Sequence, residues 1–247
     1  MMKLQKLAGA VLLGSLALGM VAPQALAASE DLTGKGTVTF LEDKSITGPT
    51  DPEEPGKEVE VDPGEGTTQT EQGPLSVDFV SVLKFGEQTL TPSANAGVYE
   101  AQATTITKDG EKVERGNYVQ VTDKRSGSTK QGWQLSAAMT KKFTSETTQD
   151  EIGGATISFA NPFLNSDQAD KGDIQTNATV LLESDGSSAP VANAAAGKGW
   201  GTYTVEYGTS TDANMDKSVI LTVPASTPLS VDEEYTADIT WTIANLD

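Results

Sequence analysis

The sequence predicts an all-β protein whose main part is an antiparallel β-sandwich-like domain. Short stretches alternate apolar and polar residues, as in residues 75–79, and turn-forming pairs such as Asp109-Gly110 separate them. A period of two is that of a half-buried strand, and regular turn spacing is typical of sandwiches. Thr is abundant, and no long run repeats at helical spacing. The other expected strands include 118–122, 155–159, 202–207 and 218–223, whereas the Ala-rich segment 190–199 is expected to be a loop.

The composition excludes several classes of chemistry. The chain of 247 residues has 17 Lys and Arg against 35 Asp and Glu, a net charge of −18, and neither Cys nor His. Ser-His-Asp triads, Cys nucleophiles, Cys/His zinc sites and disulfides are therefore impossible. The negative charge also argues against nucleic acid as a partner, because phosphate binding requires clustered Lys and Arg. A carboxylate-based enzyme, an oxygen-ligand metal binder, or a binding or structural module remains, and we expect no cofactor.

Residues 1–27 have the pattern of a secretory signal peptide. Lys3 and Lys6 precede an apolar run over residues 7–21, and Ala25-Leu26-Ala27 provides a small-x-small cleavage site. The apolar run is short for a bilayer span, and an uncleaved N-terminal anchor is the alternative. No later stretch reaches membrane length, so we expect a secreted mature chain without a transmembrane segment.

Two segments separate this leader from the main domain. Residues 28–47 form an N-terminal strand region, in which 37–41 reads as a short strand that could pair back onto the main domain. Residues 48–73 contain four Pro, eight acidic residues and only one basic residue. Proline and like-charge repulsion predict a disordered acidic linker there. The predicted β-domain then covers residues 74–247.

Two of the three Trp residues lie in matching sequence contexts. Each begins or occupies a strand in which every second residue is apolar, so that the Trp and an aliphatic residue share one face about 7 Å apart. Two such strands, laid side by side, would form a flat aromatic-aliphatic surface. The residues concerned are Trp133 and Leu135 in the first strand, and Tyr235, Trp241 and Ile243 in the second.

These motifs resemble those of the WxL family of Gram-positive surface proteins. Trp133-Gln134-Leu135 is similar to the proximal W-x-L of that family. Residues 235–243 are similar to its distal Y-x-x-x-L-T-W-T-L, with Ile239 and Ile243 in place of Leu. The resemblance covers about residues 74–247, with further similar segments at 75–79, 84–86, 117–125, 199–203 and 223–224.

The resemblance implies an exported protein that attaches non-covalently to the Gram-positive cell wall, with peptidoglycan as the receptor. The sequence has no Leu-Pro-x-Thr-Gly sorting pattern, which agrees with non-covalent attachment. Other WxL proteins or WxL-interacting surface proteins are the implied partners, and a scaffold that docks onto them is the alternative function. We do not expect an enzyme, although a secreted carboxylate-dependent glycan hydrolase is a further alternative.

Seven residues are candidates for contact with the cell wall or a partner. Trp faces can stack on sugars or anchor protein interfaces, yet apolar residues that alternate with polar ones usually mark a buried face. The two lysines either face wall carboxylates and phosphates or serve as solubilising charge. The oxygen-rich segment 165–173 lacks the ligand spacing of a Ca²⁺ loop, so no metal site is assigned. The candidates are Trp133, Leu135, Tyr235, Trp241, Ile243, Lys141 and Lys142.

Overall fold

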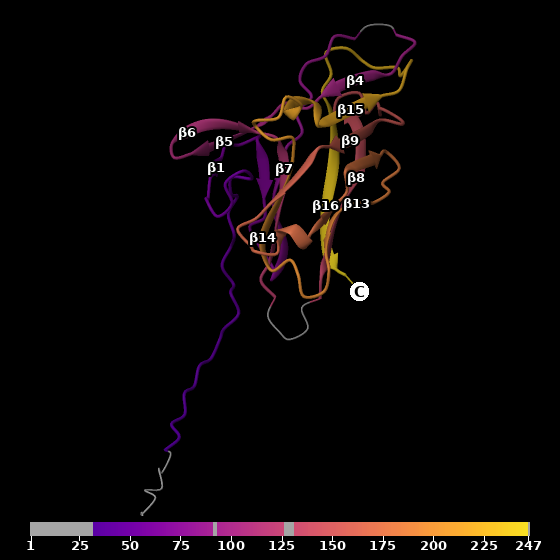
Figure 1. The fold of residues 1–247 in the computed structure, drawn as a ribbon. Coiled ribbons are helices and arrows are strands. Elements are labelled where there is room, and N and C mark those ends of the chain that lie inside the picture. The colour runs from indigo at the N-terminus through magenta and orange to yellow at the C-terminus, as the bar shows by residue number, and fades with distance from the viewer. Residues whose placement is uncertain (1–31, 91–92, 126–130, 247) are drawn as a thin grey trace, which may run out of the picture. The chain divides into compact units, whose positions relative to one another are not determined.

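A computed structural model describes residues 32–90, 93–125 and 131–246, and they form an all-β structure (Figure 1). The strands make four antiparallel sheets, so the predicted all-β antiparallel class is confirmed. A simple sandwich has two sheets, whereas the strands here are divided among four. The chain from Leu41 onward forms one compact unit. The predicted signal peptide lies outside the described residues.

Each sheet joins strands that are distant in the sequence. Two short 3₁₀ helices, η1 (Lys171–Asp173) and η2 (Met215–Lys217), lie in connections between strands. In spatial order, the first sheet consists of β1 (Glu60–Val61), β5 (Thr104–Lys108) and β6 (Glu111–Arg115), and the second of β10 (Pro162–Asn165), β14 (Gly201–Tyr207), β7 (Asn117–Asp123), β3 (Leu75–Ser81) and β2 (Gly66–Thr68). The third sheet consists of β11 (Gln175–Thr176), β13 (Ala189–Ala194), β8 (Trp133–Ser145) and β16 (Tyr235–Asn245). The fourth consists of β12 (Thr179–Glu183), β9 (Thr156–Ala160), β15 (Val219–Val223) and β4 (Gly97–Glu100).

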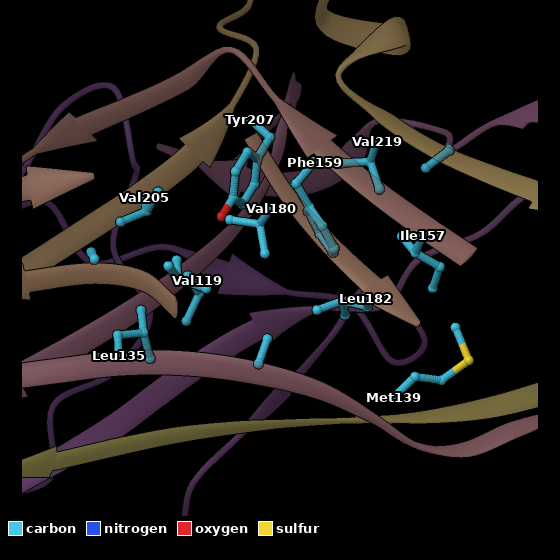
Figure 2. Close-up of a cluster of buried hydrophobic side chains, with 14 of the residues drawn as sticks. Val119, Leu135, Met139, Ile157, Phe159, Val180, Leu182, Val205, Tyr207 and Val219 are labelled. Atoms are coloured by element: carbon cyan, nitrogen blue, oxygen red, sulfur yellow. The ribbon is translucent and has the colours of Figure 1, made fainter. Parts of the chain in front are cut away.

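The main hydrophobic core draws residues from three of these sheets. Every second residue of β8 is buried along its first half, as the period of a half-buried strand requires. These side chains meet those of β7, β9, β12 and β14 (Figure 2). Phe159 of β9 contacts Tyr207 of β14 at a ring-centroid distance of 4.8 Å. The core therefore lies between the sheet that contains β7, the sheet that contains β8 and the sheet that contains β9.

Strand β7 is buried on both faces. All seven of its residues are buried, although four of them are polar. Val119 and Val121 belong to the main core, whereas Tyr118 belongs to a second cluster with Val59, Phe79 and Ile106. Among the polar residues of β7, Gln120 bonds through its side chain to residues 48–61, here called the acidic strap.

The predicted disorder of residues 48–73 is wrong. The acidic strap forms a turn, closed by the Asp51 N–H bonding to the Lys57 carbonyl at 3.0 Å, and it ends in β1. Asp51 has no exposed surface, and both its carboxylate oxygens accept hydrogen bonds from Arg115, at 2.7 and 2.8 Å. Glu65 pairs with Lys84 at 2.5 Å. The repulsion between neighbouring acids is offset by cations that lie far away in the sequence, which local composition does not reveal.

Two shorter predictions also differ from the structure. Residues 37–41 form no strand, and the side chains of Val38 and Phe40 are exposed. The Ala-rich segment 190–199 begins within a strand, β13, which pairs with β8. Small side chains suit this position because β13 packs closely beside the core. Within the described residues, no helix is long and apolar enough to cross a membrane.

Candidate functional site

The two W-x-L motifs lie on neighbouring antiparallel strands. In the register of β8 and β16, Leu135 faces Ile243, Ala137 faces Trp241 and Trp133 faces Asn245. The two motifs therefore overlap at the pair Leu135 and Ile243, although they are far apart in the sequence. Figure 1 shows β16 as the long yellow strand that carries the second motif.

The first motif contributes to the hydrophobic core. Trp133 is 1% exposed and Leu135 is fully buried. The Trp133 ring lies 5.9 Å from that of Tyr203, and its Nε1–H donates to the Gly199 carbonyl at 2.9 Å. Gly199 has φ +77°, and a Cβ there would lie 2.4 Å from Trp133 Nε1, so only glycine fits. Neither Trp133 nor Leu135 can touch a receptor in this structure, and the core interpretation holds for both.

The second motif is only partly covered. Tyr235, Trp241 and Ile243 are half-buried because β16 is at the edge of its sheet. The Trp241 ring meets Phe159 edge-on, with centroids 5.8 Å apart. The Tyr235 hydroxyl accepts a hydrogen bond from the Ser230 N–H at 2.9 Å. The two motifs, which present their apolar residues on matching faces, therefore differ in how deeply they are buried.

Trp241 and Ile239 line a small groove between β16 and the strands β2 and β3. Its volume is about 140 Å³, well below that of a typical small-molecule pocket. The polar part of its wall comes from Asp78 and from residues 67–69, which are Thr67, Thr68 and Gln69. An indole beside hydroxyl and amide groups can bind an apolar ring face together with its polar substituents. Sequence reasoning missed residues 67–69, because it assigned them to a linker.

The outer face of the β8–β16 pair is polar. The central residues of the two motifs, Gln134 and Thr242, are exposed there. Between the strands, the hydroxyls of Thr140 and Thr240 lie 2.8 Å apart. The face thus offers hydrogen-bonding groups on a regular strand framework, and the Trp side chains lie on the opposite face.

Comparison with known proteins identifies the family. A family model described as "WxL domain surface cell wall-binding" matches residues 27–246. The chain belongs to the WxL family. The resemblance noted in the sequence is therefore confirmed, and it extends further toward the N-terminus than predicted. Searches of curated proteins and of solved structures gave no match.

The function of this WxL domain is binding to the cell wall at the cell surface. The match spans the acidic strap and residues 67–69. Within the described residues, no group of three or more His, Cys, Asp or Glu is arranged to hold a metal ion.

Most basic residues near the first motif of the WxL domain have partners within the fold. Arg125 bonds bidentately to Asp123 and also to the Gln131 carbonyl and Asn245, which ties the ends of β7, β8 and β16 together. Lys124 donates to the Ser45 carbonyl at 2.7 Å.

The two candidate lysines are both exposed. Lys142 pairs with Glu151 at 3.0 Å, whereas Lys141 lies opposite Asp238 in the strand register and has no ion pair with any described residue. Lys130, the remaining residue of this basic region, lies outside the described residues. Lys141 is thus more available than Lys142 for contact with an external anion.

Proposed function

We propose that this WxL domain holds its chain non-covalently on peptidoglycan of a Gram-positive wall, with Trp241 and its groove as the contact site. Export would depend on residues 1–27 as a cleaved leader. Trp133 and Leu135 act as a rigid support beneath the contact strand, in a sandwich-like packing of the β8 sheet against the β7 sheet. The proposal concerns binding alone, without hydrolysis of the glycan.

The observation that carries the proposal is the difference between the two motif Trp residues. Trp133 is 1% exposed, whereas Trp241 keeps part of its surface in a groove with four polar residues. Burial of one Trp fixes the strand pair, and exposure of the other leaves an aromatic surface for a sugar ring. The shallow groove suits one unit of a long polymer, because a polymer can repeat a weak contact along its length.

The carboxylates support a binding role. Asp51 and Glu65 are held by Arg115 and Lys84, and Glu233 accepts a hydrogen bond from Ser145 at 2.7 Å. The groove includes one carboxylate residue, Asp78, whereas a glycosidase needs a pair that flanks the scissile bond. These arrangements serve the fold and favour a non-enzymatic protein.

A protein partner is the second candidate, and the edge position of β16 favours it. The strand has 11 residues and pairs on one side only, with β8. An edge strand with exposed backbone groups can accept a strand from another chain. Another WxL protein or a WxL-interacting protein would be the partner.

The test compares Trp241→Ala with Trp200→Ala in binding to purified peptidoglycan. Trp200 is 48% exposed and is absent from the groove lining, so it controls for loss of an exposed indole elsewhere. We expect Trp241→Ala to weaken retention at least tenfold, and Trp200→Ala to change it less than twofold. Circular dichroism and urea unfolding must show that both variants are folded.

The possible results separate the candidates. Equal retention of the Trp241→Ala variant and the unmodified chain would overturn the groove as the site. Binding to walls that keep their proteins, but not to purified peptidoglycan, would favour the partner scaffold. Release of soluble sugars or peptides from peptidoglycan would show a hydrolase instead.

A further inference from the structure

Thr50 and Gln120 meet in a buried polar site between the acidic strap and β7. Thr50 is 7% exposed and Gln120 is fully buried. The Thr50 hydroxyl donates to the Gln120 side-chain oxygen at 2.9 Å, and the Thr50 backbone N–H donates to the same oxygen at 2.8 Å. The Gln120 side-chain nitrogen donates to the Gly48 carbonyl at 2.9 Å. A nucleophile-bearing side chain and an amide are thus fixed against each other without access of bulk water.

A carboxyl group lies at the other end of the same amide. Asp78 Oδ2 is 3.3 Å from Gln120 Nε2, and Asp78 is 1% exposed. The register of β3 and β7 shifts between Val77 and Phe79, so Asp78 occupies a β-bulge. Bulges re-aim side chains, and this one lets Asp78 and Phe79 both face the strap side of the sheet.

The surroundings of Asp78 act on its pKa in opposite directions. Its two oxygens accept hydrogen bonds from Ser76 at 2.6 Å and from Thr122 at 2.5 Å. Burial nevertheless raises the pKa of Asp78, because the low-polarity site disfavours a charged carboxylate. The positive charge of Lys124 lowers this pKa, but its ammonium group donates to the Ser45 carbonyl at the surface.

We propose that Thr50 and Gln120 become joined by an intramolecular ester bond. The Thr50 oxygen attacks the Gln120 side-chain carbonyl carbon, and a C–O bond forms. The bond from that carbon to Nε2 breaks, and the nitrogen leaves as ammonia together with the hydroxyl proton. No oxidant, reductant or further reactant takes part. The mass of the product is that of the unreacted chain less one ammonia.

The geometry supplies what acyl transfer requires. The Thr50 N–H lies at the distance of an oxyanion-hole donor from the oxygen on which negative charge develops. The hydroxyl proton is already directed at the amide oxygen, and Asp78 Oδ2, which accepts a hydrogen bond from Gln120 Nε2–H, lies where the carboxyl can pass a proton to the departing nitrogen. Attack by a Thr hydroxyl is slow in water, and proximity in a site without solvent offsets this.

The cross-link would fasten the acidic strap permanently to the centre of β7. It closes a loop between residues 50 and 120, and closing a long loop stabilises a fold mainly by restricting the unfolded chain. This inference does not depend on what the WxL domain binds, so a negative wall-binding result leaves it intact.

Mass spectrometry of the purified full chain tests the proposal. We expect most molecules of the protein without substitutions to have lost one ammonia. Their digest should contain one pair of peptides joined through Thr50 and Gln120. Hydroxylamine, which cleaves esters, should separate that pair. A digest in which Thr50 and Gln120 occur only in separate, unmodified peptides would overturn the proposal.

Three variants locate the chemistry. Thr50→Val keeps the side-chain shape and the backbone N–H but lacks the hydroxyl. We therefore expect every molecule of this variant to keep the Gln120 amide and to show no loss of ammonia. Thr50→Ser keeps the hydroxyl and should still form the link. Asp78→Asn should lower the linked fraction at least tenfold in chains whose circular dichroism is unchanged. Loss of ammonia from Thr50→Val would also overturn the proposal, because the reaction would then lie elsewhere.

Discussion

At the scale of single residues, surroundings rather than residue type decide the role of a side chain. Trp133 and Trp241 occupy equivalent places in two similar motifs, yet the first bonds to Gly199 in the core and the second lines a groove. The difference comes from strand position, since β8 has neighbours on both sides and β16 has one. A substitution at Trp133 therefore tests stability, whereas one at Trp241 tests binding.

Glu206 gives a pH-dependent prediction at the same scale. It has no exposed surface, one carboxylate oxygen accepts the Gly116 N–H at 2.8 Å, and within the described residues the other oxygen has no partner. Burial, assisted by the charge of Glu53, raises the pKa of Glu206 from 4.5 to about 8. The folded protein thus holds a proton that the unfolded chain releases at lower pH.

The sign follows from that difference in pKa. Between pH 4.5 and about 8 the unfolded chain ionises Glu206 while the fold keeps it neutral, so stability falls as the pH rises through this window. We expect Glu206→Gln to reduce that fall, which urea unfolding at both ends of the window would measure. Parallel curves for the variant and the unmodified chain would contradict the expectation.

At the scale of elements, the acidic strap depends on one buried ion pair. Asp51 has no exposed surface, and Arg115 is its bidentate partner. The ammonium nitrogen of Lys108 also lies 3.4 Å from Asp51 Oδ2. Arg115→Ala leaves a buried carboxylate without its main partner, which costs about 3–5 kcal/mol in comparable cases. We expect a loss of this order in the free energy of unfolding, together with faster proteolysis within the strap.

Lys112→Ala is the matched control for Arg115→Ala. Lys112 also pairs with an acid of the same N-terminal region, Asp62, but both side chains are largely exposed. Exposed pairs contribute about 0–1 kcal/mol, so this variant should unfold almost like the unmodified chain. Similar losses for the two variants would show that the strap is not held by the buried pair.

The elements also show what the sequence could predict. Alternation of apolar and polar residues correctly located strands such as β3, β7 and β9. It also indicated which motif residues share a face, but period alone does not say whether that face is covered. The strap and β13 were missed because their order comes from distant partners, Arg115 and Gln120 for the strap and β8 for β13. Composition within a short window contains no information about such partners.

At the scale of the whole molecule, the excess of acidic over basic residues governs its approach to a wall. Wall polymers that carry phosphate or carboxylate repel such a protein, and salt screens the repulsion. The screening length falls from about 30 Å at 0.01 M salt to about 8 Å at 0.15 M. We therefore expect sedimentation with purified walls to increase over this range of salt.

A decrease of sedimentation with salt would point to Lys141. Release by salt would indicate a local attraction strong enough to exceed the overall repulsion, and Lys141 is the exposed candidate. Charge reversal in a Lys141→Glu variant would then abolish the salt dependence. Insensitivity of both proteins to salt would exclude electrostatics from attachment.

The pairing of β16 with β8 has a consequence for how the chain is made. β16 leaves the ribosome after the other strands of the described residues, and its partner β8 is completed about 90 residues earlier by the spacing of their bounds. Until then, one edge of β8 has no neighbour, and the core side chains beneath it remain open to solvent. Nascent molecules, and molecules that have lost β16 by proteolysis, would thus expose an unpaired strand edge that promotes aggregation. A chaperone that covers β8 during secretion would therefore benefit this protein more than one that binds its first strands.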